Sequence, residues 1–326
     1  MTRLQDDLMA RARPDIEKIE KELKANLTPY FDLVAQTAGH LMFAGGKRLR
    51  PLLIVLSARI CGFEDPFVYR FAGIFEYLHT ATLLHDDVVD GASIRRGKPV
   101  AHSIWGAPTA VLTGDFLLAR ALSIASETRN PKIISVVAEV TEQMSQGEIY
   151  QLMKKGDLFF SENEYFDVIM RKTGVLIQGA CRTGAMLAGA RRKWEDALAG
   201  YGRNMGIVFQ IADDILDYTA DTEVLGKAVG ADLREGKLTL PVIYALKNAG
   251  EKDRTEMEGI ICRPDFTKID FIRLIELINK YNGIDYSKKT ADAYLKRAQE
   301  SLSPLPSCPA RDLLVIVAEY ALKRDK

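Results

Sequence analysis

Apolar residues recur at intervals of three and four along most of this chain, and the apolar–polar alternation typical of strands is scarce. The pattern predicts helices over residues 15–27, 30–44, 71–91, 109–127, 132–153, 162–190, 195–218, 240–248, 271–281, 286–302 and 310–324, with a further helix that starts near residue 51. We therefore expect an all-α fold of ten or more helices around a central cavity.

Breaks in this pattern are short. A glycine pair, Gly45-Gly46, ends the second predicted helix, residues 225–236 form a glycine-rich polar loop, and residues 303–309 form a proline-rich turn. The middle of the chain has no linker rich in Pro, Gly or Ser, although the length alone would suggest about two domains. We therefore predict a single domain over residues 1–326.

The helix predicted over residues 71–91 ends in three acids, Asp86, Asp87 and Asp90. Asp86 and Asp90 lie one turn apart on one helix face, where their charges repel each other. Mg²⁺ relieves such repulsion, since it binds through a few carboxylates and shares its remaining positions with substrate phosphates. The alternative is a solvated acidic helix end. The apolar run before the acids argues against that alternative, because it draws them toward a core.

A second motif of the same form ends the apolar segment NMGIVFQIADDILD, with acids at Asp213, Asp214 and Asp217. One DDxxD motif on an apolar helix is weak evidence of a metal site, whereas two such motifs are strong evidence. If the two helices face each other, their carboxylate rows flank one cavity and hold several Mg²⁺ ions between them.

Basic residues gather at four other places, which are residues 47–50, Arg95 with Arg96, Lys172, and a glycine-rich loop that carries Lys227 and Lys237. The first group leads into a helix N-terminus, where backbone N–H groups favour a phosphate. Arginine offers a planar fork that suits diphosphate oxygens. The basic residues at 47–50 could instead be solvated surface, and Lys172 could extend its amine to water. Their alternation with the acids indicates two phosphate subsites above apolar helix faces. The ligand that fits is a diphosphate on a hydrocarbon tail.

Charge and composition exclude several classes of protein. The chain has 44 basic and 44 acidic residues, which argues against nucleic acid or an anionic membrane as a partner. Its four cysteines, at positions 61, 181, 262 and 308, have no CxxC spacing and are typical of reduced thiols in the cytoplasm. The N-terminus lacks the apolar core of a signal peptide, and no apolar run approaches the length of a membrane span. We therefore expect a cytoplasmic protein with no integral membrane segment.

Five motifs together resemble the trans-prenyltransferases, the polyprenyl diphosphate synthases: GGKRLRP, LLHDDVVD followed by RRG, the Lys172-Thr173 pair, FQIADDILD and GKAVGADLREGKLTLP. The likeness runs in order from about residue 30 to the C-terminus. The segment EYLHTATLLHDDVVD is most similar to long-chain bacterial members of octaprenyl diphosphate synthase type. The resemblance implies an isoprenoid-synthase-type helical bundle, Mg²⁺ as cofactor and a homodimer. It also implies isopentenyl diphosphate and an allylic diphosphate such as farnesyl diphosphate as substrates, with a product that is handed to the membrane.

The resemblance also assigns residues. Isopentenyl diphosphate would be held by Lys47, Arg50, His79 and Arg96. The allylic diphosphate would be held by Arg95, Lys172, Thr173, Gln210, Lys227 and Lys237. Magnesium would be bound by Asp86, Asp90, Asp213 and Asp217. Catalysis is expected to depend most on Asp86, Asp90, Asp213, Lys172 and Lys227. Gly174, which follows the Lys-Thr pair, is expected to loosen the helix that carries Lys172.

Two small residues, Ala81 and Thr82, lie on the helix that leads to Asp86. By the same resemblance, short-chain members often carry bulky aromatics at these positions. The sequence therefore predicts an open tail channel and an octaprenyl product. The alternative is that small residues here only allow neighbouring helices to pack closely.

Two other classes of helical enzyme also use acids on their helices. A di-iron bundle needs two Glu-x-x-His motifs, and only Glu76 with His79 provides one. A terpene cyclase normally lacks the second DDxxD motif, which is complete here. The alternatives left open are a shorter-chain (geranylgeranyl or farnesyl) diphosphate synthase and a non-catalytic subunit of a heteromeric synthase.

Overall fold

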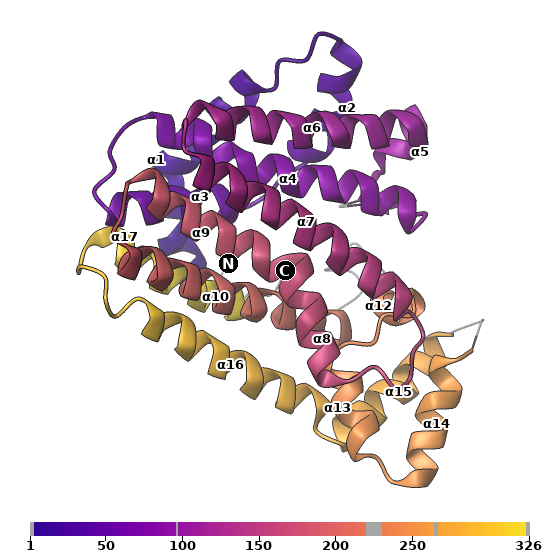
Figure 1. Cartoon of the computed structure of the whole chain (residues 1–326). Helices are drawn as coiled ribbons and strands as arrows, with labels where there is room; N and C mark the ends of the chain where they lie inside the picture. Colours follow the sequence, from indigo (N-terminus) through magenta and orange to yellow (C-terminus); the bar gives the residue numbers. More distant parts are fainter. Residues whose placement is uncertain (1–2, 96, 220–229, 264–266, 324–326) are drawn as a thin grey trace. The chain divides into compact units, whose positions relative to one another are not determined.

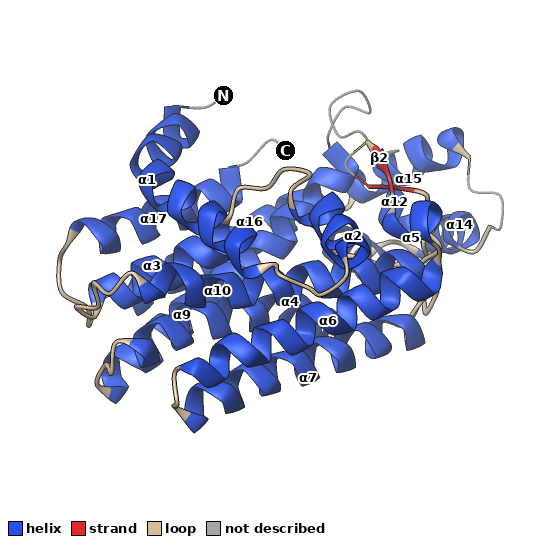
Figure 2. Ribbon diagram, turned by 90° about the horizontal axis from the view of Figure 1, so that it is seen from above, coloured by secondary structure: helices blue, strands red, loops and turns tan. Residues whose placement is uncertain are grey.

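The computed structural model describes residues 3–95, 97–219, 230–263 and 267–323, which are almost entirely helical (Figures 1 and 2). The helices of the first half are α1 (Arg3–Asn26), α2 (Asp32–Met42), α3 (Leu49–Ile60), α4 (Phe67–Val89), α5 (Ala101–Trp105), α6 (Ala107–Glu127) and α7 (Pro131–Met153). Those of the second half are α8 (Glu162–Ile169), η1 (Met170–Gly174), α9 (Val175–Leu187), α10 (Arg192–Thr219), α12 (Ala231–Arg234), α13 (Leu240–Asn248), α14 (Glu251–Ile261), α15 (Lys268–Lys280), α16 (Gly283–Ser301) and α17 (Pro309–Lys323). The strands described are the hairpin β1 (Ile94–Arg95) and β2 (Lys98–Pro99), so the prediction of an all-α fold is confirmed.

Contacts between residues divide the chain into two compact units. Unit 1 consists of Met1–Glu142, Leu176–Gly202 and Gln299–Tyr320. Unit 2 consists of Gln143–Val175, Arg203–Ala298 and Ala321–Lys326. The boundaries fall inside helices such as α7, α10 and α16 rather than in linkers. The single domain expected over residues 1–326 stays a prediction.

The core of unit 1 is built around α4, which packs along α6, α3 and α1 (Figure 1). Phe71, Phe75 and Tyr77 of α4 are fully buried, and the hydroxyl of Tyr77 donates to the carbonyl of Leu23 in α1 at 2.9 Å. Gly179 of α9 allows this packing, since a Cβ there would lie 2.9 Å from the ring of Phe75. The aromatic residues that precede the first acids therefore fix α4 in the core, as the apolar run predicted.

The core of unit 2 is formed by apolar residues of α8, α10, α13 and α15, among them Ile211, Leu240 and Leu274. The rings of Tyr244 and Tyr286 stack with centroids 3.8 Å apart and join α13 to α16. The apolar run before the second acids thus also leads into a core.

Several elements differ from the prediction. The first helix begins at Arg3 rather than near Asp15, and α14 was not predicted. The single helix expected over residues 162–190 is divided by the π-helical turn η1. Periodicity detects these segments poorly, because α14 is largely polar and a π turn shifts the register by only one residue.

Among the described residues, α6 is the one helix that has the length and apolar composition of a membrane span. Core helices of soluble proteins pass the same test. Ala110, Leu117, Ala121 and Ile124 of α6 are buried inside unit 1, which places one face of this helix in a protein core.

Candidate active site

The first acids lie at the C-terminal end of α4 in unit 1. Asp86 and Asp90 are partly exposed, whereas Asp87 is only 2% exposed. The carboxylate of Asp87 accepts a charge-assisted hydrogen bond from Nε of Arg95 at 2.7 Å. The outer acids of the motif therefore remain accessible to a ligand, while the middle acid holds an arginine.

A tight turn after α4 brings Arg95 back to the acids. Gly91 has a φ of +64°, in the left-handed region where glycine costs least, and the β1–β2 hairpin follows. After Gly91 the chain thus turns back and brings Arg95 into contact with Asp87. Arg96, which the sequence pairs with Arg95, lies outside the described residues, as does Lys227.

The second motif, in unit 2, has the same division of roles. Asp213 is exposed, and the middle acid, Asp214, is 3% exposed. Asp214 accepts a hydrogen bond from the hydroxyl of Tyr165 at 2.6 Å and another from the amide nitrogen of Gln210 at 2.8 Å. Burial, with the nearby charge of Asp232 second, raises the pKa of Asp214 well above its usual value.

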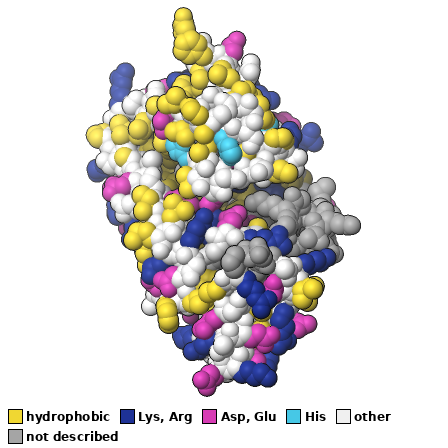
Figure 3. Space-filling view, turned by 90° about the vertical axis from the view of Figure 1, so that its right-hand side faces the viewer, with side chains coloured by type: hydrophobic (Ala, Val, Ile, Leu, Met, Phe, Trp, Pro, Cys, Tyr) yellow, Lys and Arg dark blue, Asp and Glu magenta, His cyan; other side chains and the backbone are white. Residues whose placement is uncertain are grey.

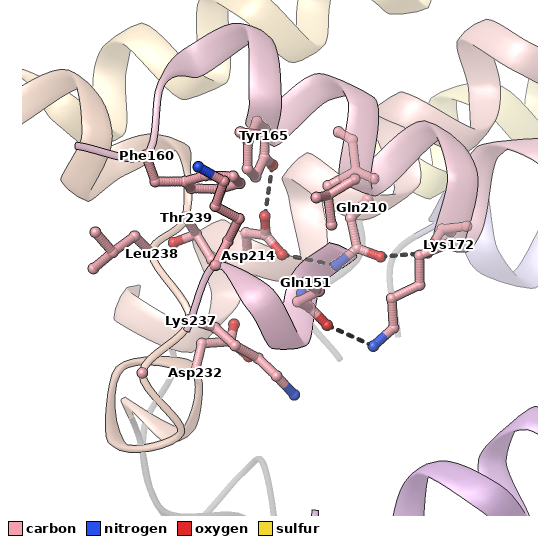
Figure 4. A pocket seen from close by; sticks show the side chains of 15 residues that line it. Gln151, Phe160, Tyr165, Lys172, Gln210, Asp214, Asp232, Lys237, Leu238 and Thr239 are labelled. Atoms are coloured by element: carbon pink, nitrogen blue, oxygen red, sulfur yellow. Dashed lines mark hydrogen bonds between the residues drawn. The ribbon is translucent and has the colours of Figure 1, made fainter. Parts of the chain in front are cut away.

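A chain of hydrogen bonds extends from Asp214 into a cavity of about 100 Å³ (Figure 4). The hydroxyl of Thr173 donates to the amide oxygen of Gln210 at 2.8 Å, and Gln210 in turn donates to Asp214. The wall of this cavity also carries three lysines, Lys154, Lys172 and Lys237. Four residues assigned to the allylic diphosphate, Lys172, Thr173, Gln210 and Lys237, thus line one cavity in unit 2.

The ammonium of Lys172 has two partners from α7 in this cavity. It lies 2.5 Å from a carboxylate oxygen of Glu148 and donates to the amide oxygen of Gln151 at 2.8 Å. Neither partner was singled out from the sequence. Both lie on α7 at a spacing of three residues, which could have indicated a shared helix face.

The turn η1 sets the direction of Lys172 and Thr173, because a π turn rotates the side chains on it relative to a regular α-helix. Gly174 ends this turn and packs against Gly206 of α10, where an added Cβ would lie 2.7 Å from the Cα of Gly174. Instead of a loose helix at Gly174, the structure thus shows a defined turn in close backbone contact with α10.

The substitution Gly206→Ala is expected to destabilise the protein by about 1–3 kcal/mol, because the new methyl group meets backbone rather than a flexible side chain. Gly259→Ala is the matched control, since Gly259 lies inside α14 with nothing within 4 Å of its added Cβ. The control is expected to be neutral or stabilising by up to about 1 kcal/mol through helix propensity. Urea denaturation of both variants measures the difference, and equal midpoints would contradict the close contact.

Asp217, the last acid of the second motif, caps the short helix α12. Its carboxylate accepts backbone N–H bonds from Ala231 at 3.1 Å and from Asp232 at 3.2 Å. Burial and the charge of Asp217 raise the pKa of Asp232 to about 7. Asp217 therefore anchors the far end of the glycine-rich loop, and its assignment to magnesium stays a prediction.

The other predicted phosphate ligands lie in unit 1. Lys47 and Arg50 flank the start of α3, and the ammonium of Lys47 lies 4.8 Å from the ring centroid of Tyr320. His79 lies on α4, where its carbonyl accepts a hydrogen bond from the hydroxyl of Thr82 at 2.9 Å. The prediction that the acid rows of α4 and α10 face each other stays a prediction.

The donor set fits Mg²⁺. Within the part of the chain that the structure describes, no three His, Cys, Asp or Glu side chains form a ready-made metal cluster. Magnesium does not require one, since it is usually bound by one or two carboxylates together with water and substrate phosphates. Asp86 and Asp90, partly exposed one turn apart, and the exposed Asp213 provide such carboxylates.

Comparisons with known proteins show the family of this chain. The family model described as polyprenyl synthetase matches residues 31–278. Octaprenyl diphosphate synthase of Haemophilus influenzae is 36% identical over 321 residues, which cover 98% of this chain and 97% of that protein. Heptaprenyl diphosphate synthase component 2 of Bacillus subtilis is 36% identical over 310 residues, which cover 95% of this chain and 88% of that protein.

Two solved structures have the same fold. A polyprenyl synthase from Caulobacter crescentus CB15, complexed with calcium and isoprenyl diphosphate, superposes with a TM-score of 0.92 at 39% identity and covers 98% of each chain. A decaprenyl diphosphate synthase from Rhodobacter capsulatus has a TM-score of 0.92 at 34% identity, with 98% of this chain and 99% of that chain covered. The fold and these comparisons therefore define an all-α prenyltransferase. The chain belongs to the polyprenyl synthetase family, and it is an enzyme of the trans-polyprenyl diphosphate synthase type.

Proposed function

We propose that this enzyme uses Mg²⁺ to condense isopentenyl diphosphate with an allylic diphosphate, farnesyl diphosphate being the expected primer, and that its product is octaprenyl diphosphate. The observation that carries the proposal is the division of roles within each acid motif. Asp87 and Asp214 are buried and hydrogen-bonded to side chains, whereas Asp86 and Asp90 are partly exposed and Asp213 is exposed, so that a metal ion can reach these three carboxylates.

The proposed reaction follows from this set of residues. The bond between C1 of the allylic substrate and its diphosphate breaks, and the bonding electrons leave with the diphosphate. Lys172, Lys237 and Arg95 offer positive charge to the leaving group, and bound Mg²⁺ supplies further charge there. The double bond of isopentenyl diphosphate attacks C1, and the departing diphosphate accepts the proton that is then lost. The apolar helix faces exclude water from the cation.

The product length is part of what we propose, because the relatives are named for products of different lengths. They include a geranylfarnesyl diphosphate synthase from Aeropyrum pernix and the decaprenyl diphosphate synthase mentioned above. Ala81 and Thr82 favour a long product, since neither is bulky.

The test is incubation of the purified chain with labelled isopentenyl diphosphate and dimethylallyl, geranyl or farnesyl diphosphate, with Mg²⁺ or with chelator. Chromatography then gives the product length. Octaprenyl product that requires Mg²⁺ supports the proposal, and shorter product alone would favour a geranylgeranyl or farnesyl diphosphate synthase. Absence of product from the chain alone would instead favour a component of a heteromeric synthase, as the name of the Bacillus subtilis relative describes for that protein.

We also propose a homodimer in the cytoplasm. Large apolar side chains are exposed on unit 1 near α2, α5 and α6, namely Tyr30, Phe31, Leu33, Ile104, Val111, Leu112 and Leu122. On the face drawn in Figure 3, hydrophobic side chains are most frequent in the upper part, and an exposed apolar patch is typical of an interface. The four cysteines are free thiols, in agreement with a reducing compartment. Light scattering of the purified chain measures its mass in solution.

The division of roles gives a test of its own at Asp87. Asp87→Asn keeps the shape of the side chain but removes the charge that holds Arg95. We expect the KM for the allylic diphosphate to rise about tenfold, because a charge-assisted hydrogen bond positions this arginine. The Mg²⁺ concentration at half-maximal rate should stay unchanged. A raised Mg²⁺ requirement with an unchanged allylic KM would show that Asp87 is itself a metal ligand.

A further inference from the structure

Arg48, between the two predicted phosphate ligands Lys47 and Arg50, is buried. It is 4% exposed, and its backbone has the left-handed conformation, with φ +50° and ψ +34°, at the residue that precedes α3. This conformation is unfavourable for a residue with a side chain, so neighbouring contacts must maintain it. The sequence alone gives no reason to distinguish Lys47, Arg48 and Arg50. The structure distinguishes Arg48 from the other two, because its side chain is buried.

Each nitrogen of the Arg48 guanidinium has its own acceptor on a different helix. Nε donates to Glu20 of α1 at 3.0 Å, Nη1 donates to Glu76 of α4 at 3.0 Å, and Nη2 donates to the carbonyl of Met42 at the end of α2 at 2.9 Å. All these residues belong to unit 1. The planar group is therefore fixed in position and in orientation, which an ammonium cannot reproduce.

The contact between Arg48 and Glu76 joins the segment that carries Lys47 and Arg50 to α4, the helix that ends in the first acids. Glu76 is buried on α4, one turn before His79, and its second carboxylate oxygen is buried without a hydrogen-bond partner. Stability alone explains such a pair poorly, because a buried ion pair often contributes less than apolar side chains of the same size. The buried pair is better explained if it fixes the segment at residues 47–50 relative to α4.

We infer that Arg48 is a positioning residue for the isopentenyl diphosphate subsite. It contacts α1, α2 and α4 and thereby fixes the backbone from which Lys47 and Arg50 project. The inference rests on the proposed function, which assigns these two residues to isopentenyl diphosphate. A change in the placement of a phosphate ligand by a fraction of an ångström raises KM for that substrate and leaves the other subsite intact.

The test compares four variants with the wild type. Arg48→Met removes the guanidinium, Arg48→Lys keeps its charge, and the double variant Arg48→Met/Glu76→Met removes both charges of the buried pair. Arg59→Met is the matched control. It breaks the bidentate ion pair between Arg59 and Asp15, which joins α3 to α1 with distances of 2.9 and 2.7 Å. Each variant is measured for thermal midpoint and for KM with either substrate varied at saturation of the other.

Arg48→Met is expected to raise KM for isopentenyl diphosphate about tenfold and to change the allylic KM less than about twofold. Arg48→Lys should give an intermediate KM. The double variant should regain thermal stability, since no unpaired buried charge remains, and yet keep the raised KM. Arg59→Met should lower the thermal midpoint and leave both KM values unchanged.

Recovery of KM together with stability in the double variant would overturn the inference, and so would an equal rise in both KM values for Arg48→Met. Absence of any turnover with isopentenyl diphosphate in the wild type would instead reject the proposed function. Wild-type turnover with a normal KM in Arg48→Met would reject the inference alone.

Discussion

Asp86→Asn and Asp213→Asn are each expected to lower turnover by about two to three orders of magnitude at saturating substrate, while the fold is retained. Each substitution removes one carboxylate charge that is accessible to metal, and asparagine keeps the size of the side chain. Steady-state kinetics over a range of Mg²⁺ concentrations measure the loss, and circular dichroism confirms the helical content.

Asp196→Asn provides the control for these two variants. Asp196 lies on the same helix as Asp213 and is likewise exposed, but it lies outside the acid motif and pairs with Arg192 one turn away. Its substitution should leave turnover and Mg²⁺ dependence unchanged, because an exposed ion pair of this kind contributes little. Near-normal turnover of either acid variant at saturating Mg²⁺ would contradict the assignment of that acid to metal.

Ala81→Phe, Thr82→Phe or both are expected to shift the product toward farnesyl or geranylgeranyl diphosphate while turnover is retained. At a rise of about 1.5 Å per residue, Thr82 lies roughly 6 Å below Asp86 and Phe75 roughly 16 Å below it on nearly the same stripe of α4. Ala81 is fully buried and Thr82 is partly buried. A phenyl ring at either position would fill the path of a growing tail.

Leu83→Phe is the control, since it adds a ring at a partly buried position that lies about 100° around the helix from Thr82 on the side away from Ala81, and about 160° from Ala81. Chromatography of the products of all variants should show normal length for Leu83→Phe alone. If the variants at 81 and 82 stay active and make product of the wild-type length, this face of α4 does not line the tail channel. The small residues then serve close helix packing.

Much of this fold follows from apolar periodicity, as α4 and α10 show. Each is a long apolar helix whose burial places the acids at its end, and the sequence predicted both. The role of each acid within a motif could not be predicted in the same way. Asp86 and Asp87 are chemically identical, and only the helix face and the later position of Arg95 leave Asp86 partly exposed and Asp87 buried.

Other features depend on residues that are distant in the sequence. The turn η1 adds one residue to a helical register, and Gly206, its partner on α10, lies 32 residues after Gly174. Arg48 differs from Lys47 and Arg50 because Glu20 and Glu76 each lie 28 residues away, on helices that only the fold brings together. Local patterns carry no information on such contacts.

The pairing of Lys172 with Glu148 and Gln151 has a consequence for substrate binding under the proposed function. Because the ammonium already has a carboxylate partner, an anion that binds there gains only the difference between the two interactions. We therefore expect binding at Lys172 to favour a diphosphate, which carries more charge over more oxygens, over a monophosphate or an uncharged alcohol. Inorganic diphosphate is expected to compete with Glu148 in the same way as the allylic substrate does.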